Sequence, residues 1–370
     1  MKKVIVGLSG GVDSAVAVIK LKEAGYLVEG MFMRNWDSSL NNDVLGNPNN
    51  FDEICPQEQD YNDALITANQ LGIKLHRVDF VKEYWEYVFT YFLDEYKKNR
   101  TPNPDILCNS EIKFKFFLEA AVKLDADYIA MGHYARVVHY PDVVLKRGID
   151  DSKDQSYFLC QLNREQLSKS LFPIGELTKK EVREIALKHN LKIAKKKDST
   201  GVCFIGERDF KLFLENYLPA KPGLMKTLRN EVVGKHDGLM YYTIGQRKGL
   251  GLGGDFGPWF VLGKDVINNV LIVGYKDDQN YLYSDMCFAI NFNWLSEDFT
   301  EIFCTAKFRY RSKDIKVKIT KITNNKVKVE YPNKFRAVTP GQAVVFYDGE
   351  VLLGGATIDE VYNEGIKRKY

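Results

Sequence analysis

The feature that most constrains this chain is the stretch VIVGLSGGVDSAVAV at residues 4–18. An apolar run typical of a buried strand breaks at a Ser-Gly-Gly sequence, and apolar residues resume after Asp13 and Ser14. Two glycines at such a joint allow the backbone to approach another group closely, and the N–H groups at the start of the following helix point toward an anion. A plain turn is the alternative, but a strand, a glycine-rich loop and a helix in this order favour a phosphate site.

The first third of the chain alternates between helix-like and strand-like segments. Periodicity predicts helices over 12–24, 61–72 and 111–124, and strands over 4–8, 27–33, 74–80 and 127–135. This order favours a parallel sheet with helices on both faces. Ligands of such sheets bind at the carboxyl ends of the strands, and Ser9 and Gly132-His133 both lie at such ends.

The remaining sequence changes character twice. Thr178 and Glu181 form a capping box that predicts a helix up to residue 190. Residues 219–275 are dense in glycine and proline, which indicates a small domain rich in turns. Short alternating strands follow from residue 284, including a hairpin around Asn324-Asn325, and they favour a small barrel. We therefore expect domains at 1–210, 211–280 and 281–370.

Charge and cysteine content narrow the class of protein. The net charge is only +3, but residues 305–336 hold eleven lysines and arginines against two acids. This pattern fits a polyanion binder or a solvated, lysine-rich sheet. No run approaches the roughly 18 apolar residues of a membrane helix. The six cysteines form no CxxC pair, so we expect reduced thiols, a cytoplasmic location and no membrane partner.

The stretch TPNPDILCNSEIKF at 101–114 places a cysteine in polar surroundings. Pro102 and Pro104 are expected to keep residues 101–105 extended, because a proline excludes the residue before it from the helical region. Cys108 is expected just before a helix, where the helix dipole would lower the pKa of its thiol. A buried structural cysteine is the alternative, but the neighbouring asparagines and aspartate are too polar for a core position.

A second cysteine lies in AKKKDSTGVCFIGERDF at 194–210. Cys203 follows three consecutive lysines and a Ser-Thr-Gly sequence of the kind that forms a hinge. Cationic surroundings favour the thiolate, and a flexible segment would let the sulfur move. A structural cysteine in a loop is equally compatible with this stretch.

Together these stretches resemble one family. The SGG-x-DS loop resembles that of the ATP-pyrophosphatase group, and it lacks the lysine of the GxxxxGK[ST] loop. Nearly the whole chain resembles the tRNA-specific 2-thiouridylases, which replace the 2-carbonyl oxygen of the wobble uridine with sulfur. The matching motifs include GLSGGVDS (7–14), MFMRNW (31–36), TPNPDILCN (101–109), GHYA (132–135), KDQSYFL (153–159), KKKDSTGVCFIGER (195–208), YTIGQRKGLGLGG (242–254), RYR (309–311) and VTPGQAVVFY (338–347).

The resemblance implies a fold, a reaction and the residues for it. The fold would be α/β, with an N-terminal parallel-sheet nucleotide-binding domain like that of adenine nucleotide hydrolases, a small middle domain and a C-terminal β-barrel. Cys108 would be the nucleophile and Cys203 the persulfide carrier. ATP would be bound by Gly7, Leu8, Ser9, Gly10, Gly11, Val12, Asp13, Ser14, Met33 and Gly132, with Asp13 meeting the phosphates through Mg²⁺.

The resemblance also implies the nucleic-acid contacts. Asn103, Pro104 and Asp105 would meet the target base. The tRNA contacts would be His133, Lys153, Asp154, Gln155, Arg309, Tyr310 and Gln342. The expected substrates are tRNAs for Lys, Glu and Gln, and the expected sulfur donor is a cysteine desulfurase or a sulfur-relay protein. Cys55, Cys160, Cys287 and Cys304 are expected to serve packing.

Two other functions share parts of this pattern. An enzyme that adenylates a small metabolite would use the same loop, but it would leave the basic segment at 305–336 unexplained. A nucleotide-regulated RNA-binding protein would use the loop and the basic segment without catalysis, its cysteines forming a redox switch. Release of pyrophosphate that requires tRNA would separate the thiolating enzyme from both.

Overall fold

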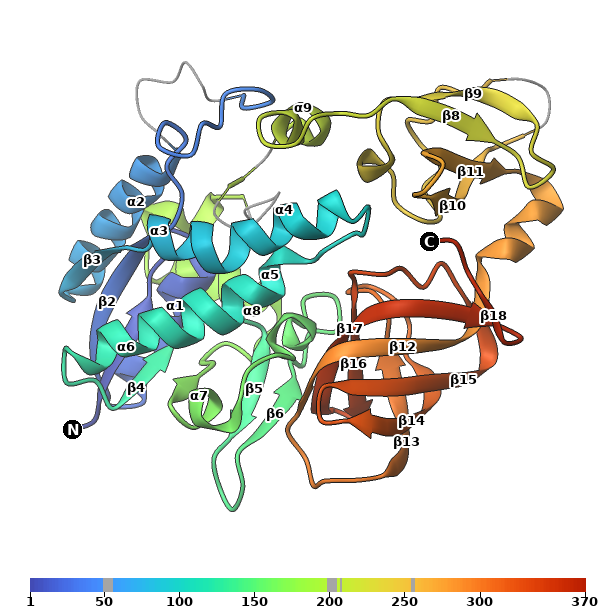
Figure 1. Cartoon of the computed structure of the whole chain (residues 1–370). Coiled ribbons are helices and arrows are strands. Elements are labelled where there is room, and N and C mark those ends of the chain that lie inside the picture. Colours follow the sequence, from blue (N-terminus) through green and yellow to red (C-terminus); the bar gives the residue numbers. More distant parts are fainter. Residues whose placement is uncertain (49–55, 198–204, 207, 254–256) are drawn as a thin grey trace. The chain divides into compact units, whose positions relative to one another are not determined.

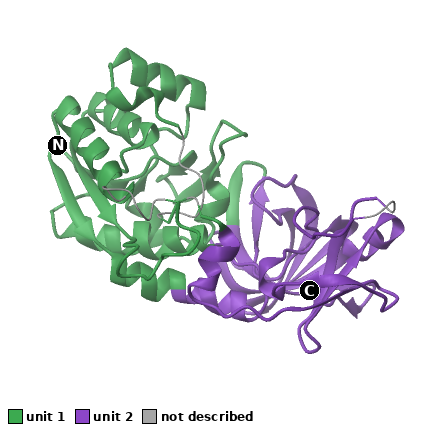
Figure 2. Ribbon diagram, turned by 90° about the horizontal axis from the view of Figure 1, so that it is seen from above, with its two compact units in different colours: residues 1–89, 104–209, 349–353 green, residues 90–103, 210–348, 354–370 purple. Residues whose placement is uncertain are grey.

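The computed structural model describes residues 1–48, 56–197, 205–206, 208–253 and 257–370. The chain forms two compact units, drawn in different colours in Figure 2. The first comprises residues 1–89, 104–209 and 349–353, and the second comprises 90–103, 210–348 and 354–370. The three-domain division expected from the sequence stays a prediction.

The first unit is built on a five-stranded parallel sheet with the order β3-β2-β1-β4-β7. The same unit contains a short antiparallel hairpin of β5 and β6 outside this parallel sheet. Lys146 of β6 pairs with Val351. The strands are β1 (Lys3–Gly7), β2 (Leu27–Arg34), β3 (Leu75–Asp79), β4 (Tyr128–Ala130), β5 (Ala135–Val138), β6 (Val144–Arg147) and β7 (Ser170–Leu171).

Helices cover this sheet and supply its core (Figure 1). They are α1 (Val12–Glu23), α2 (Pro56–Leu71), α3 (Val81–Tyr84), α5 (Pro104–Leu107), α6 (Phe117–Val122), α7 (Arg164–Ser168), α8 (Lys179–Lys188), the π-helical η1 (Trp85–Phe89) and η2 (Cys108–Phe116), and the 3₁₀ turns η3 (Ser156–Leu159) and η4 (Lys192–Lys195). Val4 and Val6 of β1 join one core with α1, α2 and α8. Ile5 points to the opposite face and is equally buried, so both faces are covered.

The described part of the second unit contains two β structures and the α-helices α4 (Thr90–Lys97) and α9 (Phe210–Glu215). The smaller structure is a four-stranded sheet with the order β10-β11-β8-β9. Its elements are β8 (Gly223–Lys226), β9 (Val232–His236), η5 (Leu239–Tyr241), β10 (Phe260–Asp265), β11 (Val270–Gly274) and η6 (Lys276–Leu282). A core around Trp259, Val261 and Leu271 holds it together.

The larger β structure is a closed barrel. Its strands run in the order β12-β15-β14-β13-β16-β17, and β17 pairs back to β12. They are β12 (Tyr283–Trp294), β13 (Glu301–Lys307), β14 (Ile315–Thr323), β15 (Lys326–Arg336), β16 (Ala343–Asp348) and β17 (Val351–Asn363), with a short β18 (Ile366–Lys367) paired to β17. Along β14, Val317 and Ile319 are buried while Lys316 is exposed, which is the expected alternation.

The α/β fold with a parallel sheet and a C-terminal barrel is confirmed. One expected strand, 127–135, is wrong in extent, because β4 ends at Ala130 and the chain leaves the sheet before β5 begins at Ala135. The capping box of Thr178 and Glu181 is present, with both reciprocal hydrogen bonds. In the described part of the chain, every helix is too short or too polar to cross a membrane.

One buried lysine in the second unit predicts a pH dependence of stability. Lys264 of β10 is only 2% exposed, and burial lowers the pKa of its ammonium group to about 7 from 10.5. Between these two pH values the unfolded chain binds more protons than the folded chain, so stability rises with pH in this window. We expect Lys264→Met to remove that rise.

The measurement is urea unfolding at pH 7, 8, 9 and 10. The difference in unfolding free energy between the wild type and Lys264→Met should change steadily across this series. Lys248→Met, at an exposed position, is the control and should follow the wild type. Parallel curves for wild type and Lys264→Met would contradict the prediction.

Candidate active site

The loop between β1 and α1 has a backbone that only glycine can adopt at one position. Gly10 has φ +74°, in the left-handed region, and a Cβ there would lie 2.3 Å from the carbonyl oxygen of Asp60 in α2. The loop is therefore pressed directly against the backbone of α2. The glycine that the sequence placed at this joint is required by close packing as well as by the turn.

Hydroxyl groups hold the loop in shape. The backbone N–H of Ser9 donates to Ser14 Oγ at 3.2 Å, and Ser14 Oγ donates to the carbonyl of Gly11 at 3.0 Å. Gly11 is the N-cap of α1 and provides no side-chain cap. The first N–H groups of this helix thus have no side-chain capping acceptor, which is the arrangement that binds anions.

The segment after β4 closes on the same loop. A Cβ on Gly132 would lie 2.8 Å from the backbone nitrogen of Ser14, and a Cβ on Gly7 would lie 2.5 Å from Met131 Sδ. Met33, at the end of β2, is buried beside them, its Cε 3.7 Å from the same Cβ position on Gly7. The structure therefore brings the loop, Met33 and Gly132 together at an edge formed by carboxyl ends of parallel strands.

Two lysines from distant sequence positions reach this loop. Lys179 Nζ, at the start of α8, lies 2.7 Å from Asp13 Oδ1 and 3.0 Å from Oδ2, and the Tyr134 hydroxyl donates to the same carboxylate at 2.9 Å. Lys196 Nζ donates to the carbonyl of Gly10 at 3.2 Å. A loop that lacks its own lysine is thus flanked by cationic groups.

Lys196 is also held by two carboxylates of α2. Its Nζ lies 2.8 Å from Asp60 Oδ1 and 2.6 Å from Asp63 Oδ2. Partial burial opposes its charge, but the bonds to Asp60 and Asp63 outweigh burial and raise the pKa of Lys196. The sequence identified the lysine run only as surroundings for Cys203, because nothing local links it to residues more than 130 positions earlier.

The carboxylate expected to meet magnesium is already neutralised. Asp13 is the one acid within the loop, and both of its oxygens lie within 3.0 Å of the Lys179 ammonium. Among the residues described, no cluster of three or more His, Cys, Asp or Glu could hold a metal ion. The described residues at this loop do not fit a resident magnesium site.

Cys108 lies inside a continuous helix. The expected helix start just after Cys108 is wrong, because α5 begins at Pro104, so Pro104 and Asp105 are helical as well. The reason is that Pro104 restricts Asn103 but is itself well suited to the first helical position. Cys108 opens the π-helical segment η2 and is fully buried, and Asn109 is buried beside it in sequence, so the expectation that polar neighbours exclude a buried position is wrong. Widened turns of this type are frequent at functional sites.

The three other cysteines in the described part of the chain all have thiols whose pKa is raised by burial. Burial raises the pKa of the Cys160 thiol to about 12 and also raises that of Cys287, and both are fully buried. Burial likewise raises the pKa of Cys304 to about 12. Burial therefore favours the neutral thiol form of all three, and their packing role stays a prediction. Cys203 and Cys55 lie outside the described residues.

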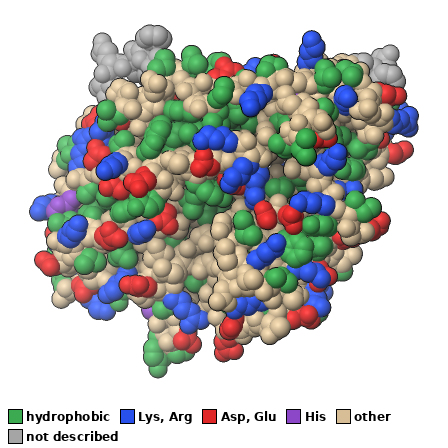
Figure 3. Space-filling model, viewed as in Figure 1, with side chains coloured by type: hydrophobic (Ala, Val, Ile, Leu, Met, Phe, Trp, Pro, Cys, Tyr) green, Lys and Arg blue, Asp and Glu red, His purple; other side chains and the backbone are tan. Residues whose placement is uncertain are grey.

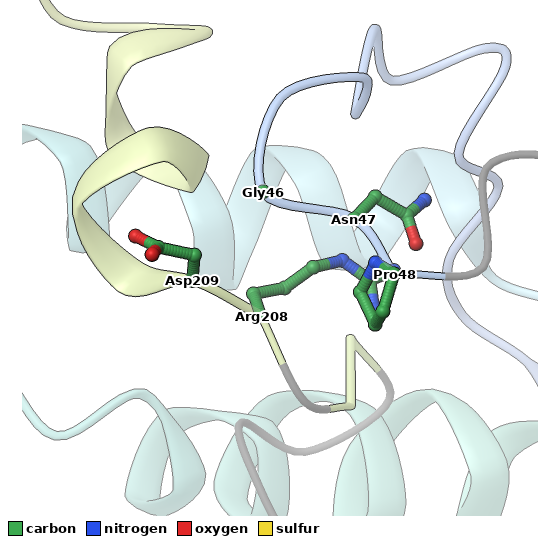
Figure 4. A pocket seen from close by; sticks show the side chains of 5 residues that line it. All are labelled: Gly46, Asn47, Pro48, Arg208 and Asp209. Atoms are coloured by element: carbon green, nitrogen blue, oxygen red, sulfur yellow. The ribbon is translucent and has the colours of Figure 1, made fainter.

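A buried ion pair lies close to Cys203 in sequence. Arg208 NH2 is 2.8 Å from Asp43 Oδ2, and the side chains are 7% and 0% exposed. The Trp36 indole donates to the same oxygen at 3.0 Å, and the Asp209 N–H donates to the carbonyl of Gly46 at 2.9 Å. Figure 4 shows the Arg208 side chain reaching toward Asn47 and Pro48, beside an open cavity of about 450 Å³.

The expected tRNA contacts in the first unit have partners within it. The Asp154 carboxylate is buried and accepts from the N–H groups of Gly148 and Ser156, each at 3.1 Å. The Gln155 side chain accepts from the Tyr134 N–H at 3.1 Å. His133 packs between Phe114 and Phe172, and burial, with a smaller effect of Lys113, lowers its pKa well below the usual value. Lys153 is only partly exposed.

The expected contacts in the second unit are also engaged. The Arg309 guanidinium donates to the carbonyls of Ala337 at 2.8 Å and Ile244 at 3.1 Å, while Tyr310 lies next to it, partly exposed. Gln342 Nε2 donates to the carbonyl of Thr101 at 2.9 Å. Because Asn103 belongs to this unit, the structure groups it with Gln342, while Asp105 and Cys108 belong to the first unit.

The basic segment 305–336 is partly neutralised in the fold. Lysines 318, 321, 328 and 334 pair with Glu301, Asp298, Glu330 and Glu364. Three of these four acids lie outside the segment, so its count of charges overstates the positive potential of the surface. On the face seen in Figure 3, basic side chains are interspersed with acidic ones.

Comparison with known proteins finds matches along nearly the whole chain. Three family models match in succession: a tRNA methyl transferase HUP domain at residues 2–207, a tRNA methyl transferase PRC-barrel domain at 211–275 and an aminomethyltransferase beta-barrel domain at 284–358. A Bacillus cereus protein described as tRNA-specific 2-thiouridylase MnmA is 56% identical over 371 residues, covering 100% of this chain and 97% of that protein. The chain belongs to the tRNA-specific 2-thiouridylase family.

Other relatives agree with this membership. A tRNA-specific 2-thiouridylase MnmA of Bacillus anthracis is 55% identical over 368 residues, covering 99% of this chain and 96% of that protein. Among solved structures, a 4-thiouridine synthetase in complex with RNA and ATP aligns at 18% identity and a TM-score of 0.35. It covers 56% of this chain and 46% of that one, a likeness too slight to carry an inference.

The Arg208–Asp43 pair gives a stability prediction for this family member. Asp43→Ala leaves the buried Arg208 without its carboxylate, so we expect the free energy of unfolding to fall by about 3–5 kcal/mol. Urea unfolding measures this loss. Asp237→Ala is the matched control, because Asp237 pairs with Lys211 at an exposed site and should lose less than about 1 kcal/mol. Equal losses in the two variants would contradict the prediction.

Proposed function

We propose that the chain converts a uridine of tRNA to 2-thiouridine, using ATP to activate the 2-carbonyl oxygen and a cysteine persulfide as the sulfur source. The full-length match at 56% identity carries this proposal. It is supported by a glycine-rich loop whose following helix has no side-chain cap and by the presence of both cysteines of the family pattern. A cytoplasmic location is part of the proposal.

The proposed nucleotide site is the edge where β1, β2 and β4 end. The polyphosphate of ATP, entering with Mg²⁺, would accept hydrogen bonds from the N–H groups of Gly10 to Ser14 and from the hydroxyl groups of Ser9 and Ser14. Gly7, Leu8, Met33 and Gly132 would line the adenosine side. Lys179 and Lys196 stand beside this loop, so they would offset the charge of the leaving pyrophosphate.

The proposed chemistry gives the carbonyl oxygen a good leaving group. The oxygen at C2 of the uridine attacks the α-phosphate of ATP, pyrophosphate leaves, and the base becomes adenylated. The terminal sulfur of a Cys203 persulfide then forms the bond to C2, and AMP leaves. The sulfur–sulfur bond breaks when Cys108 attacks Cys203 Sγ, either after the bond to C2 has formed or before it, in which case hydrosulfide is the species that attacks C2. Cys108 and Cys203 end as a disulfide, which a reductant must reopen.

The proposed tRNA contacts follow the family pattern. Asn103, Pro104 and Asp105 would meet the target base, directly ahead of Cys108 in the sequence. Further contacts would come from His133, Lys153, Asp154, Gln155, Arg309, Tyr310 and Gln342. The proposed substrates are tRNAs for Lys, Glu and Gln, and the proposed sulfur donor is a cysteine desulfurase or a relay protein.

The two cysteines give the most direct test. Cys108→Ser and Cys203→Ser should each abolish 2-thiouridine formation while ATP still binds, because serine cannot carry or reduce a persulfide sulfur. Mass spectrometry of nucleosides from tRNA incubated with ATP, Mg²⁺ and a sulfur source measures the product. Cys160→Ser is the control. Substantial product from either active-site variant would refute the assigned roles, and pyrophosphate release that needs a small acid rather than tRNA would refute the function.

The close contact at Gly132 gives a second test. A methyl group on Gly132 would lie 2.8 Å from the nitrogen of Ser14 and would displace the start of α1. Losing one charge-assisted hydrogen bond to phosphate costs about 1.5–3 kcal/mol, so Gly132→Ala should weaken ATP binding about tenfold to a hundredfold. Calorimetric titration with ATP measures this change.

The control for this test is Gly72→Ala. Gly72 has φ +63°, in the left-handed region, and a Cβ there meets nothing within 4 Å, so the substitution adds backbone strain away from the loop. Its affinity for ATP should equal that of the wild type. If Gly132→Ala bound ATP as tightly as Gly72→Ala does, the nucleotide would not depend on the loop as proposed.

A further inference from the structure

The segment that precedes the proposed base contacts is fixed by the barrel. Thr101 lies two residues before Asn103, and both of its backbone polar groups are bonded to one barrel turn at 339–342. Its N–H donates to the carbonyl of Pro340 at 3.0 Å, and its carbonyl accepts from Gln342 Nε2 at 2.9 Å. All of these residues belong to the second unit.

A glycine lets the two backbones pass this closely. Gly341 has φ +91°, and a Cβ there would lie 2.9 Å from the backbone nitrogen, carbon and oxygen of Thr101. No residue with a side chain fits that contact. The Thr-Pro-Gly-Gln sequence of this turn thus brings both Gly341 and Gln342 against Thr101.

Neighbouring residues add two further ties. The Arg100 side chain is 16% exposed, and its NH1 lies 2.8 Å from Asp359 Oδ1 of β17. Its NH2 donates to the carbonyl of Ile358 at 2.8 Å. The buried Lys264 of β10 donates to the carbonyl of Asn99 at 2.7 Å. Three consecutive residues, 99–101, are thus each bonded to a β structure of the second unit.

We propose that Gln342, Gly341 and Arg100 are positioning residues that set the place of the segment meeting the target base. This inference rests on the proposed function. Only Pro102, with its fixed φ, separates Thr101 from Asn103, so a displacement of Thr101 is passed on to the base contacts. Gln342 has both a donor and an acceptor on its amide, so it can hold Thr101 while its oxygen contacts tRNA. Occupancy of the barrel by tRNA is thereby coupled to the position of Asn103.

The principal test uses Gly341→Ala in the full-length chain. The added methyl group displaces Thr101, so kcat for 2-thiouridine formation should fall about tenfold to a hundredfold while Kd for tRNA stays within about twofold, because misplacement affects the reacting geometry more than binding. Gly365→Ala is the control, since Gly365 has φ +75° with nothing within 4 Å. A rise in Kd with kcat unchanged at saturating tRNA would overturn the proposal.

A milder variant guards against misfolding. Gln342→Met keeps the length of the side chain and removes the donor to Thr101. We expect it to lower kcat in the same direction as Gly341→Ala, whereas a residue that only binds tRNA would raise Kd alone. Arg100→Lys should retain more kcat than Arg100→Ala, because lysine preserves the ion pair with Asp359 but not the bond to Ile358.

Hydrogen exchange followed by mass spectrometry tests the positioning without any activity. In the protein alone, Gly341→Ala and Gln342→Met should speed exchange in the peptide spanning 98–103, and Gly365→Ala should leave it unchanged. Unchanged exchange in both test variants would overturn the positioning role. Failure of the wild type to form 2-thiouridine, with faster exchange in these variants, would instead refute the proposed function and leave the tie of Thr101 to the barrel intact.

Discussion

The contact of backbone with backbone around the SGGVDS loop is the constraint on which the first unit depends. Gly10 leaves no room for a Cβ against the carbonyl of Asp60, and Gly132 leaves none against the nitrogen of Ser14. The start of α2 and the segment after β4 must therefore converge on the loop after β1. This convergence explains why β4 ends at Ala130: the chain has to leave the sheet so that Gly132 can pass the start of α1.

The positive charges beside this loop come from lysines far away in the sequence. A loop that held its own lysine would place one cation by local geometry alone, whereas here Lys179 and Lys196 come from α8 and from the end of η4. Each is already paired with aspartate, so neither ammonium is desolvated without compensation. When the proposed ATP substrate binds, each lysine would exchange an aspartate partner for a phosphate oxygen. No isolated, hydrated lysine would have to lose its water. The exchange costs less because the ammonium groups are already fixed in place.

The sequence predicted those features whose causes are local. The strand, loop and helix at 4–18, the capping box of Thr178 and Glu181 and the hairpin at Asn324-Asn325 depend on neighbours a few residues apart, and all three are present. The predicted start of the helix that carries Cys108 is wrong because two effects of Pro104 compete. Proline keeps the residue before it out of the helical region, but it also favours the first helical position, and the second effect prevails.

Features set by distant pairs gave no signal in the sequence. Lys196 and Asp60 are separated by 136 residues, and Gln342 and Thr101 by 241. The charge of the segment 305–336 does not include Glu301 and Asp298, which pair with Lys318 and Lys321 in the folded barrel. Local periodicity reports secondary structure, and it is silent on which elements the fold brings together.

Three interactions between residues far apart in the sequence have the same physical effect. Lys196 holds the carbonyl of Gly10, Asp43 holds Arg208, and Gln342 holds Thr101. In each case a group from far along the chain fixes the backbone within a few residues of a proposed reacting or binding residue. The proposed sulfur transfer would require the base, the α-phosphate and two sulfurs to meet in one geometry, and a displacement of about 1 Å can cost a hundredfold in rate. Such long-range interactions reduce that displacement more than local turns do. A local turn fixes the shape of a segment, whereas a long-range interaction also fixes the position of the segment relative to the core.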